Sequence, residues 1–141
     1  MEPTVVTVNV TVHAPLQRTW AFFTEPAYIT QWNFASDDWH SPKAENDLKV
    51  GGVFSSRMEA KDGSFGFDFG GVYTAVNLHE SFAYVLGDGR KVSVQMDSNG
   101  DTTVVTQKFD AEQQNPVELQ QAGWQAILNN FKKFVESQVN E

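Results

Sequence analysis

Charged residues that could form an acid–base pair gather in one part of the chain. Arg57 and Glu59 precede an Asp62-Gly63 dipeptide, and Asp68 follows it. An Asp-Gly pair between two strand-like runs predicts a tight hairpin, which would bring these charges opposite one another. A carboxylate with a raised pKa inside a cavity could serve as a general acid or base. We favour instead an ion pair on the solvent face, because the alternating aromatic residues are better candidates for the interior.

The histidines and glycines match no known catalytic or metal-binding motif. His13, His40 and His79 have no partner at ligand spacing, and the chain has no Cys that could form a thiolate site or a disulfide. No nucleophile elbow or glycine-rich phosphate loop occurs. The sequence therefore predicts no catalytic residue, no metal site and no cofactor.

Composition and charge limit the classes of partner. The net charge is −8, which argues against nucleic acid and against anionic membrane surfaces. Residues 1–12 alternate in polarity, unlike a signal peptide, and no apolar run is long enough to insert into a membrane. A chain of 141 residues is expected to form a single domain over 1–141, and the cytoplasm is the expected location.

A long amphipathic helix is predicted from Pro116 to Val139. Its apolar residues recur at helical spacing and form one stripe: Leu119, Trp124, Ile127, Leu128, Phe131, Phe134 and Val135. The opposite side is polar: Gln120, Gln121, Gln125, Asn129, Asn130, Lys132, Lys133 and Glu136. Gly123 is expected to let the helix approach a sheet closely.

Most of the preceding chain is predicted to be strands. Val6 to Val12 alternates, and two short helices follow, one after Ala14-Pro15 and one carrying Ile29 and Trp32. A polar loop, Asn33 to Asp47, is expected to hold a short strand at Asp38 to His40. The other predicted strands are Val53–Ala60, Phe65–Val76, Glu80–Leu86, Lys91–Met96 and Thr102–Phe109. Short connections favour antiparallel pairing, so the fold class is α+β, with a curved antiparallel sheet around the C-terminal helix.

An apolar pocket is predicted where the helix faces the sheet. Phe67, Phe69 and Tyr73 share a strand face by the period of two, and Gly70-Gly71 would bend that strand. The predicted ligand-binding residues are Met58, Phe67, Phe69, Tyr73, Trp124, Leu128 and Phe131, with Trp39 near the mouth. The Tyr73 hydroxyl or the Trp124 indole N–H would orient an apolar, aromatic or lipid-like ligand. Trp20, Phe23 and Ile127 are expected to be mostly buried as well.

Several motifs, in order, resemble one protein family over nearly the whole chain. They are Ala14-Pro15, Thr19-Trp20, Thr24, Pro26, Ile29, Trp32, Asp47–Gly52, Met58–Gly63, Phe69–Tyr73, Glu80, Thr102–Val104 and Gly123-Trp124 with Ile127-Leu128. The sequence resembles the activators of the heat-shock protein 90 ATPase in their small bacterial form. That family belongs to the superfamily of START proteins, birch-pollen allergens and polyketide cyclases, also called SRPBCC.

The resemblance implies a helix-grip fold with an apolar pocket, and it leaves three hypotheses for function. The first is a non-catalytic protein that binds a small apolar or aromatic ligand. The second is a polyketide cyclase-like enzyme that uses Asp68, Glu59 or Tyr73 in the pocket. The third is an interaction module with a chaperone partner. The direction of Asp68 discriminates the first two: Phe67 and Phe69 pointing inward favours binding, and Asp68 pointing inward favours catalysis.

Overall fold

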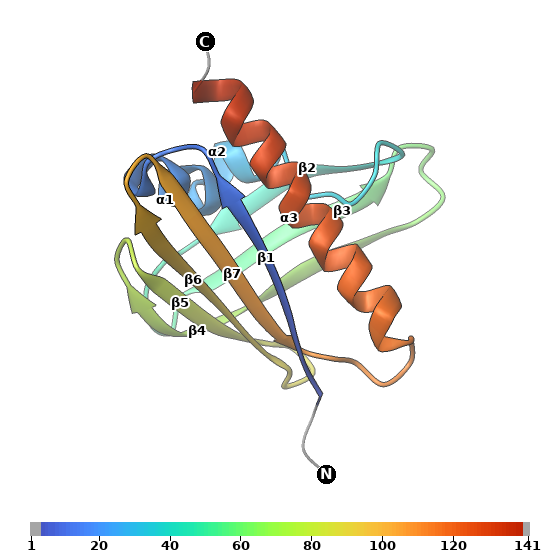
Figure 1. The fold of residues 1–141 in the computed structure, drawn as a ribbon. Coiled ribbons are helices and arrows are strands. Elements are labelled where there is room, and N and C mark those ends of the chain that lie inside the picture. Colours follow the sequence, from blue (N-terminus) through green and yellow to red (C-terminus); the bar gives the residue numbers. More distant parts are fainter. Residues whose placement is uncertain (1–3, 140–141) are drawn as a thin grey trace.

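A curled antiparallel sheet gripping one long helix makes up the computed structural model, which describes residues 4–139 (Figure 1). The elements in chain order are β1 (Val5–Val12), α1 (Leu16–Thr24), α2 (Pro26–Ile29), β2 (Trp39–Asn46), β3 (Val53–Ala60), β4 (Gly66–Asn77), β5 (Ser81–Leu86), β6 (Lys91–Asn99), β7 (Thr102–Asp110) and α3 (Val117–Val139). Within this range the seven strands form one sheet in the order β1-β7-β6-β5-β4-β3-β2. The α+β helix-grip architecture predicted from the sequence is confirmed.

Strand register puts alternate residues on the concave face beneath α3. In β6 the buried residues are Val92, Val94 and Met96, and β1 buries every second residue, which is a valine each time from Val6 to Val12. The hairpin predicted at Asp62-Gly63 joins β3 to β4, with Arg57 opposite Asp68 and Met58 opposite Phe67. This pairing fixes which side chains face inward, because a shift of one residue would reverse both faces.

The strand β2 is where the structure differs most from the sequence-based expectation. We predicted a polar loop with a strand only at Asp38 to His40, whereas β2 runs from Trp39 to Asn46. It is an edge strand, with a bulge between His40 and Lys43 that contains Pro42. Charged residues, proline and bulges are typical of exposed sheet edges, so a polar segment can be a strand there without an apolar alternation.

Helix α3 packs across the sheet and along its other edge, β1 (Figure 1). On its inner face, the α3 residues Leu128, Phe131 and Val135 are fully buried. Two assignments on this helix were wrong. Leu119, placed in the apolar stripe, is 60% exposed, and Gln120, placed on the polar side, is buried. Leu119 lies in the first turn, before the helix reaches the core, while Gln120 donates through Nε2 to the Asn115 carbonyl at 2.8 Å.

Aromatic side chains dominate the core beneath α1 and α2. Trp20 is buried, and Trp32 donates its indole N–H to the Phe22 carbonyl at 2.9 Å. Trp20, Leu128 and Phe131 are buried as predicted, and Phe23, Trp124 and Ile127 are partly buried and pack against the same core. Among residues 4–139, no helix is both long and apolar enough to cross a membrane.

Candidate functional site

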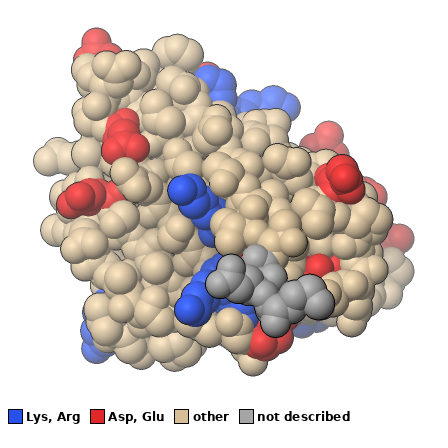
Figure 2. Space-filling view, turned by 60° about the horizontal axis from the view of Figure 1, so that its bottom comes forward, with Lys and Arg blue, Asp and Glu red and all other residues tan. Residues whose placement is uncertain are grey.

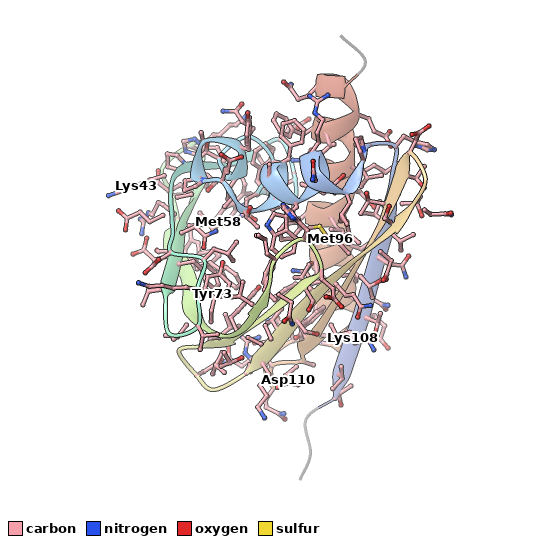
Figure 3. The ribbon with its side chains drawn as sticks, turned by 90° about the vertical axis from the view of Figure 1, so that its left-hand side faces the viewer. Lys43, Met58, Tyr73, Met96, Lys108 and Asp110 are labelled. Atoms are coloured by element: carbon pink, nitrogen blue, oxygen red, sulfur yellow. The ribbon has the colours of Figure 1, made fainter. Side chains whose placement is uncertain are left out.

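A cavity of about 310 Å³ lies between the concave face of the sheet and α3. Its walls come from α1, α2, β2 to β5, β7 and α3, and most of them are aromatic or aliphatic. Figure 3 shows Met58 and Tyr73 pointing into the space that the curled sheet encloses, while Lys43 points away from it. The volume is at the small end of the range for pockets that hold small molecules.

Six of the eight predicted ligand-binding residues line this cavity: Met58, Phe67, Phe69, Tyr73, Trp124 and Leu128. The strand period of two brings the β4 residues to one face, and helical spacing turns Trp124 and Leu128 toward them. Trp124 stacks on Phe109, with ring centroids 4.0 Å apart, and meets Phe69 edge-on at 5.9 Å. Helix and sheet therefore contribute to one continuous aromatic wall. That these residues contact a ligand stays a prediction.

The other two predicted residues, Trp39 and Phe131, lie outside the cavity lining. Trp39 packs edge-on against Phe65 and Phe67 where β2 meets the β3–β4 hairpin. Phe131 is fully buried, with its ring centroid 4.9 Å from those of Phe23 and Trp32. Phe131 follows Leu128 by about one helical turn, where α1 and α2 already fill the concave side. Sequence periodicity assigned the correct helix face but could not show where along it the cavity ends.

The charged residues of the β3–β4 hairpin point away from the cavity. Arg57 Nη1 lies 3.5 Å from Asp68 Oδ1, and Arg57 Nε donates to Glu59 Oε2 at 2.8 Å. The Asp68 side chain is 69% exposed. The hydrogen bond from Arg57 lowers the pKa of Glu59. The surface ion pair favoured from the sequence is confirmed, and the inward direction of Phe69 and outward direction of Asp68 form the arrangement that favours binding over catalysis.

A partly buried polar link crosses the cavity wall. The Tyr73 hydroxyl donates to Asn46 Oδ1 at 2.6 Å, and Asn46 Nδ2 donates to the Thr24 carbonyl at 2.6 Å. This link joins β4 through the end of β2 to the last residue of α1. Burial raises the pKa of both Tyr73 and Tyr84, so both phenols stay neutral at physiological pH. Each can supply a hydroxyl to a ligand without adding charge.

Several polar residues that the sequence interpretation missed also line the cavity. They are Asn33, Glu45, Asn46, Ser56, Tyr84, Arg90 and Gln107. For two of them a signal existed. Gln107 alternates with the buried Val105 and Phe109, and Arg90 lies two residues before the buried Val92. A polar residue at an inward position of an apolar strand marks a site where the interior needs a polar atom.

The backbone around Gly70-Gly71 explains how β4 lies so close to its neighbours. A Cβ atom at Gly71 would meet the Val85 carbonyl oxygen at 2.5 Å. Phe54, which is opposite Gly71 in the register, would also be near that atom. Gly123 is different, since a Cβ there would meet nothing within 4 Å. The expected role of Gly123 in close helix–sheet approach was therefore wrong.

The three histidines lie in separate places. His13 contacts Glu136, His40 lies 3.5 Å from Glu59, and His79 packs edge-on against Trp20. Within residues 4–139, no cluster of three or more His, Cys, Asp or Glu side chains is arranged to hold a metal ion.

Comparison with known proteins gives one family match and many structural matches. The family model described as "Activator of Hsp90 ATPase homolog 1-like protein" matches residues 13–136. The solution structure of the AHSA1-like protein from Aeromonas hydrophila is 41% identical, with a TM-score of 0.91, over 98% of this chain and 96% of that one. Protein Chr148 from Cytophaga hutchinsonii is 51% identical, with a TM-score of 0.81, over 96% of this chain and 94% of that one.

More distant structures share the fold alone. Protein CV1439 from Chromobacterium violaceum is 20% identical, with a TM-score of 0.82, over 94% of this chain and 96% of that one. A comparison with curated proteins finds no significant match. The family model covers most of the chain, and two solved structures combine high identity with the same arrangement of sheet and helix. The chain therefore belongs to the AHSA1-like family of the SRPBCC superfamily.

Proposed function

We propose that this protein binds a small apolar, aromatic or lipid-like molecule in the cavity beneath α3, and that it does so without catalysing a reaction. The observation that carries the proposal is the cavity itself, about 310 Å³ of space between packed aromatic walls. A domain of this size normally fills its interior to crystal-like density with few voids. A cavity of this volume among otherwise close-packed side chains supports a ligand-binding site.

The chemistry of the walls supports binding rather than reaction. Phe69, Trp124 and Leu128 offer apolar surface, and burial of apolar ligand surface against them is favourable at about 25 cal/mol per Å². Tyr73 is already hydrogen-bonded to Asn46, which holds its ring in place. The carboxylates of Glu59 and Asp68 lie on the other face of the sheet. A largely apolar ligand matches such walls.

Tryptophan fluorescence titration tests the proposal, because Trp32 and Trp124 both line the cavity. Neutral probes such as 1-decanol and flavone are expected to change the emission saturably. Ser56→Leu adds volume at a buried lining position, and Ser55→Leu makes the same change at the neighbouring residue on the opposite strand face. We expect Ser56→Leu to weaken binding at least about tenfold and Ser55→Leu to leave it unchanged, with circular dichroism used to check that both variants fold.

A different outcome would redirect the proposal. If no apolar, aromatic or lipid-like probe alters the emission of the wild-type protein, the ligand-binding proposal fails. The interaction-module hypothesis, which the family's name connects with the Hsp90 ATPase, would then take its place. Equal weakening by Ser56→Leu and Ser55→Leu would place the binding site outside the cavity.

A further inference from the structure

Within residues 4–139, Arg90 is the one arginine or lysine among the residues that line the cavity. It follows the turn between β5 and β6, and its backbone carbonyl accepts a hydrogen bond from the Leu86 N–H at 2.8 Å. Arg90 is two residues before Val92, the first buried residue of β6, so it shares the inward direction of that strand. A positively charged side chain is unusual at this position, because the other inward-facing residues of this strand are apolar.

The position of Arg90 is at the edge of the cavity, where the cavity meets solvent. The pairing of β4 with β5 ends at Gly71 and Leu86, while β4 continues beyond it, paired with β3, toward Phe69 and Phe67. Arg90 therefore lies where the short β5–β6 hairpin ends beside the longer β4. Its side chain is 28% exposed. A group bound to it could keep contact with water while an apolar remainder extends inward.

The guanidinium of Arg90 is held by the protein on one side only. Its Nε donates to Asp88 Oδ2 at 2.7 Å, and the backbone N–H of Arg90 donates to Asp88 Oδ1 at 3.1 Å. Within residues 4–139 its Nη1 and Nη2 have no hydrogen-bond acceptor in the protein. The Asp88 contact fixes the direction of the side chain, and the two terminal nitrogens remain able to donate in the fork geometry that suits a carboxylate.

The surrounding charges favour a ligand with one negative charge. Figure 2 looks at the lower face of Figure 1, where the β5–β6 turn and the beginning of α3 lie, and shows Lys and Arg near the middle of that face with Asp and Glu mostly around its margin. The whole chain carries −8, and Asp88 offsets part of the Arg90 charge. A dianion such as a phosphate monoester would meet more repulsion than a monocarboxylate.

We propose that Arg90 binds the carboxylate of an amphipathic monocarboxylic acid at the mouth of the cavity, with the apolar tail of the acid lying against Phe69, Trp124 and Leu128. This inference rests on the proposed function and narrows it from apolar molecules in general to fatty or aromatic acids. Tyr84 and Gln107, farther along the cavity wall, can accommodate a polar substituent on the tail.

Calorimetric titration at pH 7 with matched acids and alcohols tests the inference. The pairs are decanoate with 1-decanol, and 2-naphthoate with 2-naphthol, which separate an aliphatic from an aromatic tail. For the preferred tail, we expect the wild-type protein to bind the acid about 10- to 100-fold more tightly than the alcohol. Arg90→Gln should remove that preference and leave alcohol binding within about twofold. Arg57→Gln, the same change on the outer face of β3, should leave the preference intact.

The possible results separate the failure of this inference from the failure of the proposed function. If the alcohols bind as tightly as the acids, or if Arg90→Gln keeps the preference, the protein is an apolar binder and Arg90 has no such role. Equal losses in Arg57→Gln and Arg90→Gln would show a general charge effect and also overturn the inference. If neither acid nor alcohol binds, both proposals fail. Should Arg90→Gln not fold, the wild-type preference for decanoate over 1-decanol and decylamine decides the question alone.

Discussion

At the scale of single residues, two glycines in the chain have opposite structural roles. A Cβ at Gly71 would press on the Val85 carbonyl oxygen, whereas a Cβ at Gly123 would meet no atom within 4 Å. Gly71→Ala is expected to destabilise the protein by about 1–3 kcal/mol through overpacking. Gly123→Ala should stabilise it by about 0.5–1 kcal/mol, because alanine lowers the entropy cost of the helix interior. Urea unfolding of both variants measures this, and a loss of stability in Gly123→Ala would contradict the assignment.

Residue type and spacing could predict much of the site but not its polar part. The period of two identified Phe67, Phe69 and Tyr73, since these three residues of one strand carry the signal together. Gln107 is a single polar residue between buried positions of β7, and Arg90 immediately precedes β6, and such residues can equally mark a strand end or a solvent-facing turn. Only the three-dimensional arrangement of the strands and the β5–β6 turn shows that both line the cavity.

At the scale of the element, two leucines on α3 test how the helix is oriented against the sheet. Leu128 is 1% exposed and lines the cavity, whereas Leu119 on the same helix is 60% exposed. We expect Leu128→Ala to cost about 2–5 kcal/mol of unfolding free energy, at the lower end if the cavity already removes part of its contacts. Leu119→Ala should change the free energy of unfolding by no more than about 0.5 kcal/mol. Equal costs in chemical denaturation would contradict the orientation of α3.

The polar side of α3 has a structural task that the sequence did not suggest. Strand β1 is an edge strand, and α3 side chains satisfy the backbone groups along it. Gln125 Nε2 donates to the Asn9 carbonyl at 2.9 Å, Lys132 Nζ donates to the Thr11 carbonyl, and the His13 N–H donates to Glu136 Oε2 at 2.9 Å. Two residues of a strand and four residues of a helix both span about 6–7 Å. Polar residues about one helical turn apart on α3 can therefore reach alternate residues of β1. The sequence pattern places these residues on the polar side of the helix and does not predict their contact with β1.

Glu136 gives this contact between α3 and β1 a pH dependence. Its Oε2 accepts from the His13 N–H and from Lys132 Nζ at 2.9 Å, and it lies 2.8 Å from His13 Nδ1. Burial alone would raise the pKa of Glu136, but these hydrogen bonds outweigh it and lower the pKa to about 2. Since the folded pKa lies below the unfolded value of 4.5, the stabilisation is complete above about pH 4.5 and is lost as the pH falls toward 2.

The variant Glu136→Gln isolates this effect. At pH 7 it should be less stable than the wild-type protein by about 1–3 kcal/mol. This difference in unfolding free energy should narrow as the pH falls from about 4.5 to 2, because the wild-type carboxylate then takes up a proton. Glu80→Gln, at an exposed position in the β4–β5 turn, serves as the control and should show little gap at any pH. A Glu136→Gln gap that stays constant down to pH 2 would contradict the lowered pKa.

Element prediction succeeded where burial alternates and failed where it does not. The hairpin at Asp62-Gly63 and the strand β3 were predicted with their observed bounds, because turn chemistry and alternation agree there. Strand β2 was reduced to three residues, because an edge strand with Pro42, Lys43 and Glu45 lacks an apolar alternation. Its end matters to the site, since Asn46 holds the Tyr73 hydroxyl.

At the scale of the whole molecule, fold and cavity arise from the same packing. The sheet curls around α3, and the helix meets β1 closely through its polar side and the core through Leu128, Phe131 and Val135. Between these contacts and the distant wall formed by β3 and β4, space remains. The overall arrangement could be predicted from the sequence because every element except β2 carried a clear signal of its own. The volume of the cavity could not, because it depends on how far curvature separates two walls.

Methyl NMR spectroscopy of the protein with neutral 1-decanol tests the central claim most directly. Met58, Ile127 and Leu128 line the cavity, while Leu119 and Val5 are exposed elsewhere. The account predicts saturable chemical-shift changes and intermolecular nuclear Overhauser effects at the methyl groups of Met58, Ile127 and Leu128, and none at Leu119 or Val5. Effects confined to Leu119, Val5 or other exposed methyl groups, or no effect at any methyl group, would contradict it.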